Sequence, residues 1–396
     1  MAKSAPGRRD AGVPTRGRRT RRTRRLVAAA VIVPAAAWFA WAVHDVPASL
    51  GGESTGPRGA RMRRSPQFRD GAFRNSVPAA ILPPGSGWQI ARDLLLRREK
   101  RRPAGTIPVV TAPGTDAHAG GGGGATDAAA VVGGGLHVTW YGHSSALVEI
   151  DGRRVLFDPV WSDRCSPSAA VGPRRLHPPP VPLRRLPRLD AIVISHDHYD
   201  HLDMATVRAL TRTQSAPFLV PLGVGAHLDR WGVPADRIIE MDWADAVTIA
   251  GLRIIATAAR HFSGRAFSRD NTLWASWIVA SDAHRIFYTG DSGYFDGYAA
   301  IGAEHGPFDA TLIQIGAYGR GWPDIHMTPE EGVAAHLDVG GGLLIPLHWA
   351  TFNLAFHPWR EPADRVWREA EARDVRLAVP RPGERINVAD PPAGDG

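Results

Sequence analysis

The sequence predicts an α+β fold in which two β-sheets pack against each other and helices cover their outer faces. Two observations lead to this prediction. From residue 136 onward, short β-rich runs separated by turns recur along the chain, and helical patterns fall between some of them. The chain has 396 residues and 44% hydrophobic content, which is enough to bury at least one large core.

The predicted strands begin with a meander of three runs, LHVTWYG, ALVEI and RVLFD, in which Asp151 and Gly152 form the hairpin turn. One predicted helix has a clear start, because Thr328 is a good N-cap and Pro329 fits the first helical position. Further strands are expected at 190–195, 217–220, 252–258, 273–280, 285–289, 310–315 and 343–347, and helices at 203–213, 225–231, 329–338 and 362–373.

Positive charge is concentrated in the N-terminal quarter of the chain. Residues 1–25 carry ten Lys and Arg against one acid, and residues 53–102 carry twelve against four. From residue 103 onward there are 25 basic and 33 acidic residues. The net charge of +8 therefore does not indicate a nucleic-acid-binding surface on the main domain, and we expect no nucleic-acid partner.

An apolar stretch without a charge, residues 26–43, follows the basic segment. As a helix it would span roughly 27 Å, marginally enough for a bilayer core. This pattern favours a transmembrane anchor with residues 1–25 in the cytoplasm and the main domain outside it. The alternatives are a signal peptide cleaved near residues 40–48, which would give an exported protein, and a true start at Met62, which would give a cytoplasmic one.

Residues 44–135 are interpreted as an extension and linker, and residues 136–390 as the main domain. The Gly/Ala tract at 115–135 cannot bury a core and is expected to be flexible. Within the extension, a short helix is expected at 88–96, and the mixture of Arg and Phe in 63–75 suggests that this segment docks against the main domain.

The most informative motif is the run HDHYDH, residues 196–201, directly after a predicted strand. In an extended segment alternate residues point the same way, so His196 and His198 can share one metal ion. Asp200 and His201, one turn further on, can then reach a second ion. Imidazole and carboxylate ligands together suit zinc, with iron or manganese as alternatives.

Three more candidate ligands, His261, Asp291 and His348, each follow a predicted strand. Loops at one edge of a sheet are where a rigid scaffold presents functional groups, so these residues complete a metal site if they fold back onto the histidine run. Asp158 is placed similarly and could orient a ligand from behind.

With these residues in this order, the chain resembles the metallo-β-lactamase superfamily, whose HxHxDH run is matched by residues 196–201. It is more closely similar to the branch containing N-acylphosphatidylethanolamine-hydrolysing phospholipase D and its bacterial relatives. The resemblance covers residues 136 to about 365. The strings that carry it are HVTWYGHSSALVEIDG, VLFDPVWSDRCSPS, VGPRR, ISHDHYDHLD, YTGDSGYF, IGAYGRGW, HMTPEEGVAAHLDV and LIPLHWATFNLA.

The resemblance implies a four-layer αβ/βα sandwich with two zinc ions at one edge. It assigns His196, His198 and His261 to the first zinc, Asp200, His201 and His348 to the second, and Asp291 to a bridging position. A metal-bridging hydroxide would be the nucleophile and would attack the phosphorus of a phosphodiester. This is consistent with the absence of a Ser or Cys nucleophile motif from the sequence.

Asp200 and His326 are the predicted catalytic residues. His326 matches a family histidine near the metals and could donate a proton to the phosphoryl oxygen or the leaving group. For His143 the resemblance indicates a structural role behind the ligands. Aromatic residues near the last ligand could form the wall of a lipid-accepting groove; they are Trp322, Trp349, Phe352, Phe356 and Trp359.

The expected function is therefore that of a membrane-associated, zinc-dependent phosphodiesterase of the phospholipase D type, acting on a phospholipid or another anionic ester. A lactonase or amidase is an alternative, because the same hydroxide attacks a carbonyl carbon. A nuclease of the superfamily is another, and the excess of acidic residues after residue 103 disfavours it. The sequence gives no indication of the oligomeric state.

Overall fold

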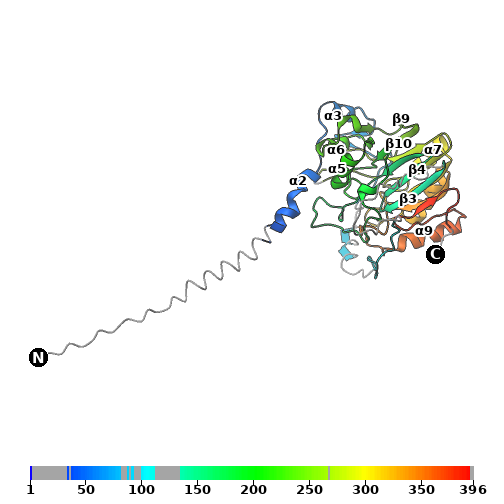
Figure 1. Ribbon diagram of the computed structural model, residues 1–396. Helices are drawn as coiled ribbons and strands as arrows, with labels where there is room; N and C mark the ends of the chain where they lie inside the picture. The colour runs from blue at the N-terminus through cyan, green and yellow to red at the C-terminus, as the bar shows by residue number, and fades with distance from the viewer. Residues whose placement is uncertain are drawn as a thin grey trace, which may run out of the picture.

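In the computed structural model, two mixed β-sheets face each other and helices lie on their outer sides (Figure 1). The structure describes residues 1, 34, 37–81, 87–88, 91–92, 100–111, 134–265 and 268–392. Alternate residues of the inner strands point between the sheets and form the central core, which includes Trp140, Val148, Ile254, Trp277 and Ile345.

The first sheet has seven strands and contains the predicted meander. Its outer face is covered by α5 (Met204–Thr213) and α6 (Gly225–Arg230), whose apolar side chains pack against those of the strands. The sheet is antiparallel up to β5 and parallel from there on. In spatial order the strands are β15 (Arg385–Asn387), β3 (Leu136–Gly142), β4 (Ser145–Ile150), β5 (Arg153–Phe157), β6 (Ala191–Val193), β7 (Phe218–Pro221) and β8 (Ile238–Met241).

The second sheet has six strands, antiparallel from β9 to β12 and parallel from β12 to β14. Its outer face packs against α7 (Gly297–His305), α8 (Pro329–Asp338) and α9 (Glu361–Ala372). In spatial order the strands are β14 (Gly341–Leu347), β13 (Phe308–Gln314), β12 (Arg285–Tyr288), β11 (Ser276–Ala280), β10 (Leu252–Thr257) and β9 (Ala246–Ile249).

All ten predicted strands and all four predicted helices of the main domain are present. Among the described residues of the domain, three strands and one α-helix were not predicted from the sequence, β8, β9, β15 and α7, nor were two short 3-10 helices at Leu183–Arg185 and Ala235–Arg237. The two sheets with helices outside are the architecture that the sequence predicted. Each sheet contains parallel strands that end at the same edge, and candidate ligands follow several of them. These strands are β5 and β6 in the first sheet and β12, β13 and β14 in the second.

Residues 46–81 lie on the main domain rather than apart from it. They include the short helices α2 (Val46–Ser49) and α3 (Gly56–Met62) and a hairpin of β1 (Phe68–Arg69) and β2 (Ala72–Phe73). Phe73 is fully buried in a cluster with Leu222 and Trp274. Segment 63–75 thus docks as its mixture of Arg and Phe suggested, because its aromatic side chain fills an apolar hollow of the domain.

Three sequence features lie wholly or mostly outside the described residues. These are the Gly/Ala tract at 115–135, the helix expected at 88–96 and the apolar stretch at 26–43, of which Pro34 and residues 37–43 are described. No helix within the described part of the chain combines the length and apolar composition needed to cross a bilayer. The transmembrane segment therefore stays a prediction.

Candidate metal centre

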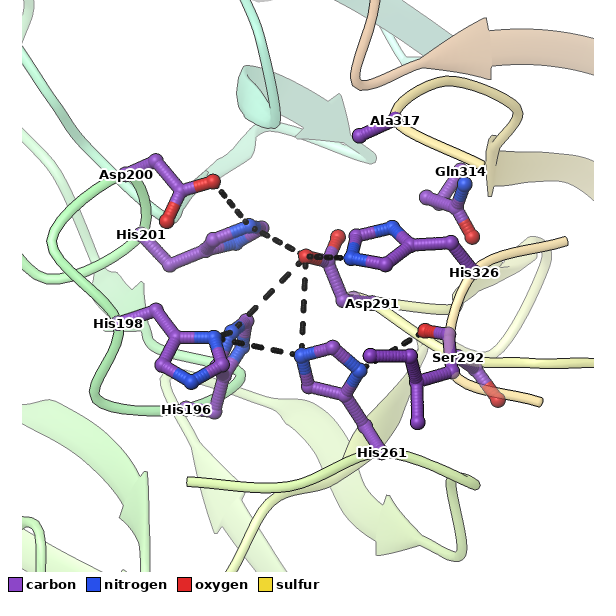
Figure 2. A network of polar contacts seen from close by, with 12 residues as sticks. His196, His198, Asp200, His201, His261, Asp291, Ser292, Gln314, Ala317 and His326 are labelled. Atoms are coloured by element: carbon purple, nitrogen blue, oxygen red, sulfur yellow. Dashed lines mark hydrogen bonds and ion pairs between the residues drawn. The ribbon is translucent and has the colours of Figure 1, made fainter. Parts of the chain in front are cut away.

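The seven predicted ligands come together at one edge of the two sheets, although they follow four different strands. Residues 196–201 follow β6, His261 follows β10, Asp291 follows β12 and His348 follows β14. In Figure 2 the imidazoles converge on one carboxylate oxygen of Asp291. The rings come from the seven-stranded sheet on one side and from the six-stranded sheet on the other.

The first group of ligands consists of three imidazoles. His198 Nδ1 lies 2.8 Å from His196 Nε2 and 3.3 Å from His261 Nε2. Their facing nitrogens are close enough to hold a single ion. His196 and His198 are two positions apart in an extended segment, so their side chains point the same way, as the sequence predicted.

The second group combines a carboxylate with imidazoles. Asp200 Oδ2 lies 3.6 Å from His201 Nε2 and 3.4 Å from His348 Nε2. His143 Nε2 lies 2.9 Å from the same carboxylate oxygen, so His143 joins this group from behind. The structure thus brings together the predicted set and adds a fourth side chain to it.

Asp291 lies between the two groups. Its Oδ2 is 3.0 Å from His201 Nε2 and 3.1 Å from His348 Nε2. The same oxygen is 3.9 Å from His196 Nε2 and from His261 Nε2. One carboxylate oxygen therefore faces both groups, which is the geometry that a bridging ligand requires.

Among the described residues, Asp291 Oδ1 is buried without a hydrogen-bond partner, and the facing nitrogens His201 Nε2 and His348 Nε2 are surrounded by the carboxylate oxygens of Asp200 and Asp291. Unsatisfied polar atoms are rare in protein interiors because each costs free energy. Imidazole nitrogens and carboxylate oxygens aimed at common points are the donor set of a dinuclear site for divalent cations such as zinc. The residues present therefore fit two metal ions.

Burial and charge favour the metal-binding protonation states of His196 and Asp291, whereas the carboxylates around His201 raise its pKa well above the usual range. Burial and the neighbouring imidazoles hold the pKa of His196 well below its usual range. Burial alone would raise the pKa of Asp291, but His201, His348 and His326 outweigh it and hold this pKa well below its usual range. Neutral imidazole and ionised carboxylate are the forms that coordinate a metal.

Asp158 orients His201 from behind, as the sequence suggested. It is fully buried, and its Oδ2 lies 2.6 Å from His201 Nδ1. Ser195 Oγ and Tyr288 OH donate to the same oxygen. Asp158 and His348 both adopt positive φ, 37° and 67°, which is uncommon for residues other than glycine and typical of functional sites.

Comparison with known proteins identifies the family. The family model of the β-lactamase superfamily domain matches residues 153–349. A Caenorhabditis elegans protein named N-acyl-phosphatidylethanolamine-hydrolyzing phospholipase D 1 is 36% identical over 253 residues, which cover 61% of this chain and 71% of that protein. The chain belongs to the metallo-β-lactamase superfamily.

Within this superfamily the chain lies in the branch that contains the N-acylphosphatidylethanolamine-hydrolysing phospholipases D. An uncharacterised protein of Mycobacterium tuberculosis is 52% identical over 376 residues, covering 94% of this chain and 97% of that protein. The solved structure of a possible metal-dependent hydrolase from Veillonella parvula aligns with a TM-score of 0.52 at 15% identity, over 64% of this chain and all of that one. This similarity shows that the two proteins share a fold. The protein is thus a metal-dependent hydrolase of the metallo-β-lactamase superfamily.

His326 lies at the rim of the metal centre of this superfamily member. Its Nε2 is 3.8 Å from Asp291 Oδ2, and its side chain is 13% exposed. Burial lowers the pKa of His326 to about 4, so the ring is neutral near pH 7. With Asp291 and His261 it also forms a group that could hold a cation. Its position therefore allows His326 to act as a hydrogen-bond donor or as a metal ligand.

A cavity of about 260 Å³ opens beside the cluster. Its polar lining residues are His198, Asp200, Asp291 and His326. Its apolar lining residues are Ile81, Phe262, Ala317, Trp322, Ile325 and Leu354.

The predicted aromatic wall is correct only for Trp322. Trp349 stacks on Trp140 at 5.4 Å, and Phe352 is buried against His143. Phe356 and Trp359 are not among the described residues that line the cavity. Of residues 349–359, only Leu354 is among the described residues that line this cavity, whereas Trp349, Phe352 and Trp359 line a neighbouring pocket beside His348. Phe262 and Ile81 take their place, and both come from segments that sequence reasoning had not connected with the cavity.

Asp197, within the histidine run, and Arg265 hold the ligand loop in place, a role that the sequence did not reveal for either residue. Asp197 Oδ1 accepts a hydrogen bond from Gly264 N (2.7 Å), and its Oδ2 lies 3.3 Å from His227 Nε2. Arg265 donates to the carbonyl oxygens of Asp197 and Leu202. These contacts fix the loop that carries the ligands. Because they join residues more than 25 positions apart, no local sequence pattern predicts them.

Proposed function

We propose that this protein is a dinuclear, zinc-dependent phosphodiesterase of the phospholipase D type that hydrolyses a phospholipid-like anionic ester. The observation that carries the proposal is Asp291 Oδ2, which faces both ligand groups beside a cavity lined by both polar and apolar side chains. The relative in C. elegans named for phospholipase D activity supports this substrate class.

In this proposal the ligand residues divide between two ions, His196, His198 and His261 for one and Asp200, His201 and His348 for the other, with Asp291 shared. When bound, two divalent ions would lower the pKa of a bound water and neutralise charge on the phosphoryl oxygens. Asp158 holds the His201 ring in place through Nδ1, so the Nε2 nitrogen is directed at the centre of the cluster.

The cavity lining favours water as the nucleophile. Among the described residues that line it there is no Ser, Thr, Cys, Tyr or Lys. His326, neutral near pH 7, is positioned to donate a hydrogen bond from its ring N–H to a phosphoryl oxygen or to the oxygen of the leaving group. Phe262 and Trp322 would contact the apolar part of the substrate and exclude water from the reacting group.

The proposal is tested by turnover with the zinc-loaded protein on a chromogenic phosphodiester, a lactone and a cephalosporin. We expect the phosphodiester to be hydrolysed and the products from a diacyl phospholipid to be phosphatidic acid and the free head-group alcohol. Release of diacylglycerol would instead indicate cleavage on the other side of phosphorus. Hydrolysis of the lactone or cephalosporin without phosphodiester turnover would contradict the proposal.

Asp291→Asn should abolish this turnover. The matched control is Asp282→Asn, because Asp282 is exposed in the turn between β11 and β12 and contacts no ligand. Equal loss in both variants would mean that the activity does not depend on the metal centre.

Membrane attachment through the N-terminal segment, with the catalytic domain outside the cytoplasm, is part of the same proposal. The helical residues 37–44 expose Trp38, Phe39 and Trp41, which are 55%, 62% and 56% accessible. Aromatic side chains of this kind favour the interface between lipid and water. Fractionation of cells expressing the full chain, with protease protection to assign the side, tests it; a full chain that stays in the soluble fraction contradicts it.

A start at Met62 is disfavoured by the contacts that it would remove. Trp231 Nε1 donates to Ala48 O at 2.8 Å, and Arg265 Nε donates to Ser49 O at 2.8 Å. Arg58 pairs with Glu240 at 2.5 Å. Mass spectrometry of the N-terminal peptide from the natural host distinguishes the start sites.

A further inference from the structure

Asn75, in the extension before the main domain, is directly bonded to the backbone of a metal-ligand candidate. His261 N donates to Asn75 Oδ1 at 3.0 Å, and Asn75 Nδ2 donates to His261 O at 2.8 Å. Both backbone groups of His261 are thus paired with one side-chain amide. The arrangement imitates the pair of hydrogen bonds between two residues of adjacent antiparallel strands.

This pair of hydrogen bonds with Asn75 matters because His261 lies outside any β-strand that could fix its backbone. Strand β10 ends at Thr257, four residues earlier, and residues 258–265 are irregular. The imidazole is fixed at one further point, through Nδ1 to Ile325 O at 2.9 Å. Asn75 therefore fixes the backbone of His261, and Ile325 fixes the ring.

Asn75 is itself held in place before any ion binds. Trp274 Nε1 donates to its Oδ1 at 3.0 Å. Two residues earlier, Phe73 is fully buried, and its N–H donates to Asp270 O at 2.8 Å. Because the amide has little rotamer freedom left to lose, its bonds to His261 are preorganised.

The segment that follows Asn75 is tied to the same side of the metal centre. Ala80 N donates to Asp324 Oδ2 at 2.8 Å, and Arg260 donates to Pro78 O. Arg260 also pairs with Asp324 at 3.1 Å. These contacts carry the chain to Ile81, which lines the cavity beside the ligands.

We infer that Asn75 is a positioning residue for the ion held by His196, His198 and His261, so that the N-terminal extension is part of the metal centre. The inference rests on the two-ion assignment of the proposed function. Groups that orient a ligand from behind typically contribute about 10–100-fold to metal affinity. The carboxylate-containing group of Asp200, His201 and His348 does not contact Asn75 and should keep its affinity.

The test measures ion content and affinity in Asn75→Ala, with zinc counted by elemental analysis and affinity measured by chelator competition. We expect one ion with the parental affinity and a second weakened about 10–100-fold. In the cobalt-loaded protein, the visible absorption of one of the two sites should change. A purely structural role for Asn75 would lower the unfolding midpoint without separating the two affinities.

Two further variants keep the test decisive. Asn387→Ala removes an asparagine side chain from the distant edge strand β15 and should leave both affinities unchanged. Asn75→Asp keeps the acceptor for His261 N and removes the donor to His261 O, and it decides the question if Asn75→Ala does not fold. Parental affinity for both ions in the folded Asn75 variants would overturn the inference. Fewer than two ions in the unaltered protein would contradict the proposed function instead.

Discussion

At the scale of single residues, His326 could serve either as a hydrogen-bond donor to the substrate or as a metal ligand. Its side chain is 13% exposed at the edge of the cluster, whereas the side chains of His261 and His348 are fully buried. We therefore expect His326→Gln to keep two ions per chain and to lower kcat by about 100-fold or more, the usual effect of removing one hydrogen-bond donor to a developing negative charge. Steady-state kinetics with elemental analysis of the same sample measures both. Loss of one ion in the variant would make His326 a ligand.

His336 provides a pH-dependent contribution to stability from a buried histidine remote from the ligands. Its Nδ1 lies 2.7 Å from Thr311 Oγ1, and burial lowers its pKa to about 4 from 6.5. Between these two values the unfolded chain binds a proton that the native chain excludes. The free energy of unfolding should thus fall by up to about 3 kcal/mol as the pH drops from 6.5 to 4.

The measurement for His336 is denaturant unfolding at several pH values in this window, for the parent and for His336→Asn. Asparagine retains an oxygen near the Nδ1 position and cannot be protonated. We expect the parent to be the more stable protein at pH 7 and the difference to narrow as the pH falls. A constant difference between the two proteins would show that His336 does not titrate in the native state.

The candidate ligands could be predicted from the sequence because four of them stand within six residues and the others each follow an apolar strand. Position at a strand end is a local property, and it was sufficient. The aromatic residues after His348 were assigned less well, because nothing local distinguishes a side chain that lines a cavity from one that fills a core. Trp322 and Trp349 illustrate the difference.

At the scale of elements, α8 begins with a capping box directly after the His326 loop. Glu331 N donates to Thr328 Oγ1 at 3.3 Å, and Thr328 N donates to Glu331 Oε2 at 2.8 Å. Thr328→Ala should lower the free energy of unfolding by about 1 kcal/mol, the usual contribution of an N-cap. Urea unfolding of the metal-loaded protein measures this. Thr213→Ala, in the exposed last turn of α5, is the control and should change stability by less than about 0.5 kcal/mol.

Three of the elements missed from the sequence, β9, β15 and α7, share a weak local signal. Strand β9 alternates between exposed and half-buried residues at the sheet edge, and β15 has only three residues. Helix α7 is rich in Gly and Ala, without an apolar stripe against a polar face. Such elements form because a neighbouring strand or sheet offers hydrogen bonds and apolar surface, which the local sequence does not reveal.

At the scale of the whole molecule, the metal centre joins the two sheets and the extension, so metal removal should weaken the entire domain. A ligand that binds only the folded state stabilises it by about 2.7 kcal/mol at a concentration 100 times its Kd. We expect chelation to lower the unfolding midpoint by several degrees and zinc to restore it. Calorimetry before and after chelation measures the shift. An unchanged midpoint, with loss of the ions verified by elemental analysis, would contradict the prediction.

The sequence by itself determined the order of strands and helices, the HDHYDH run and the later ligands His261, Asp291 and His348. These are properties of neighbouring residues: alternation within a strand, capping at a helix start, and ligand spacing in a loop. The tertiary structure decided that Asp291 faces both ligand groups, that Phe262 and Ile81 line the cavity, and that Asn75 brackets His261 from 186 residues away. Such contacts depend on how the sheets and the extension pack, and a chain can bring distant residues together only once its core has formed.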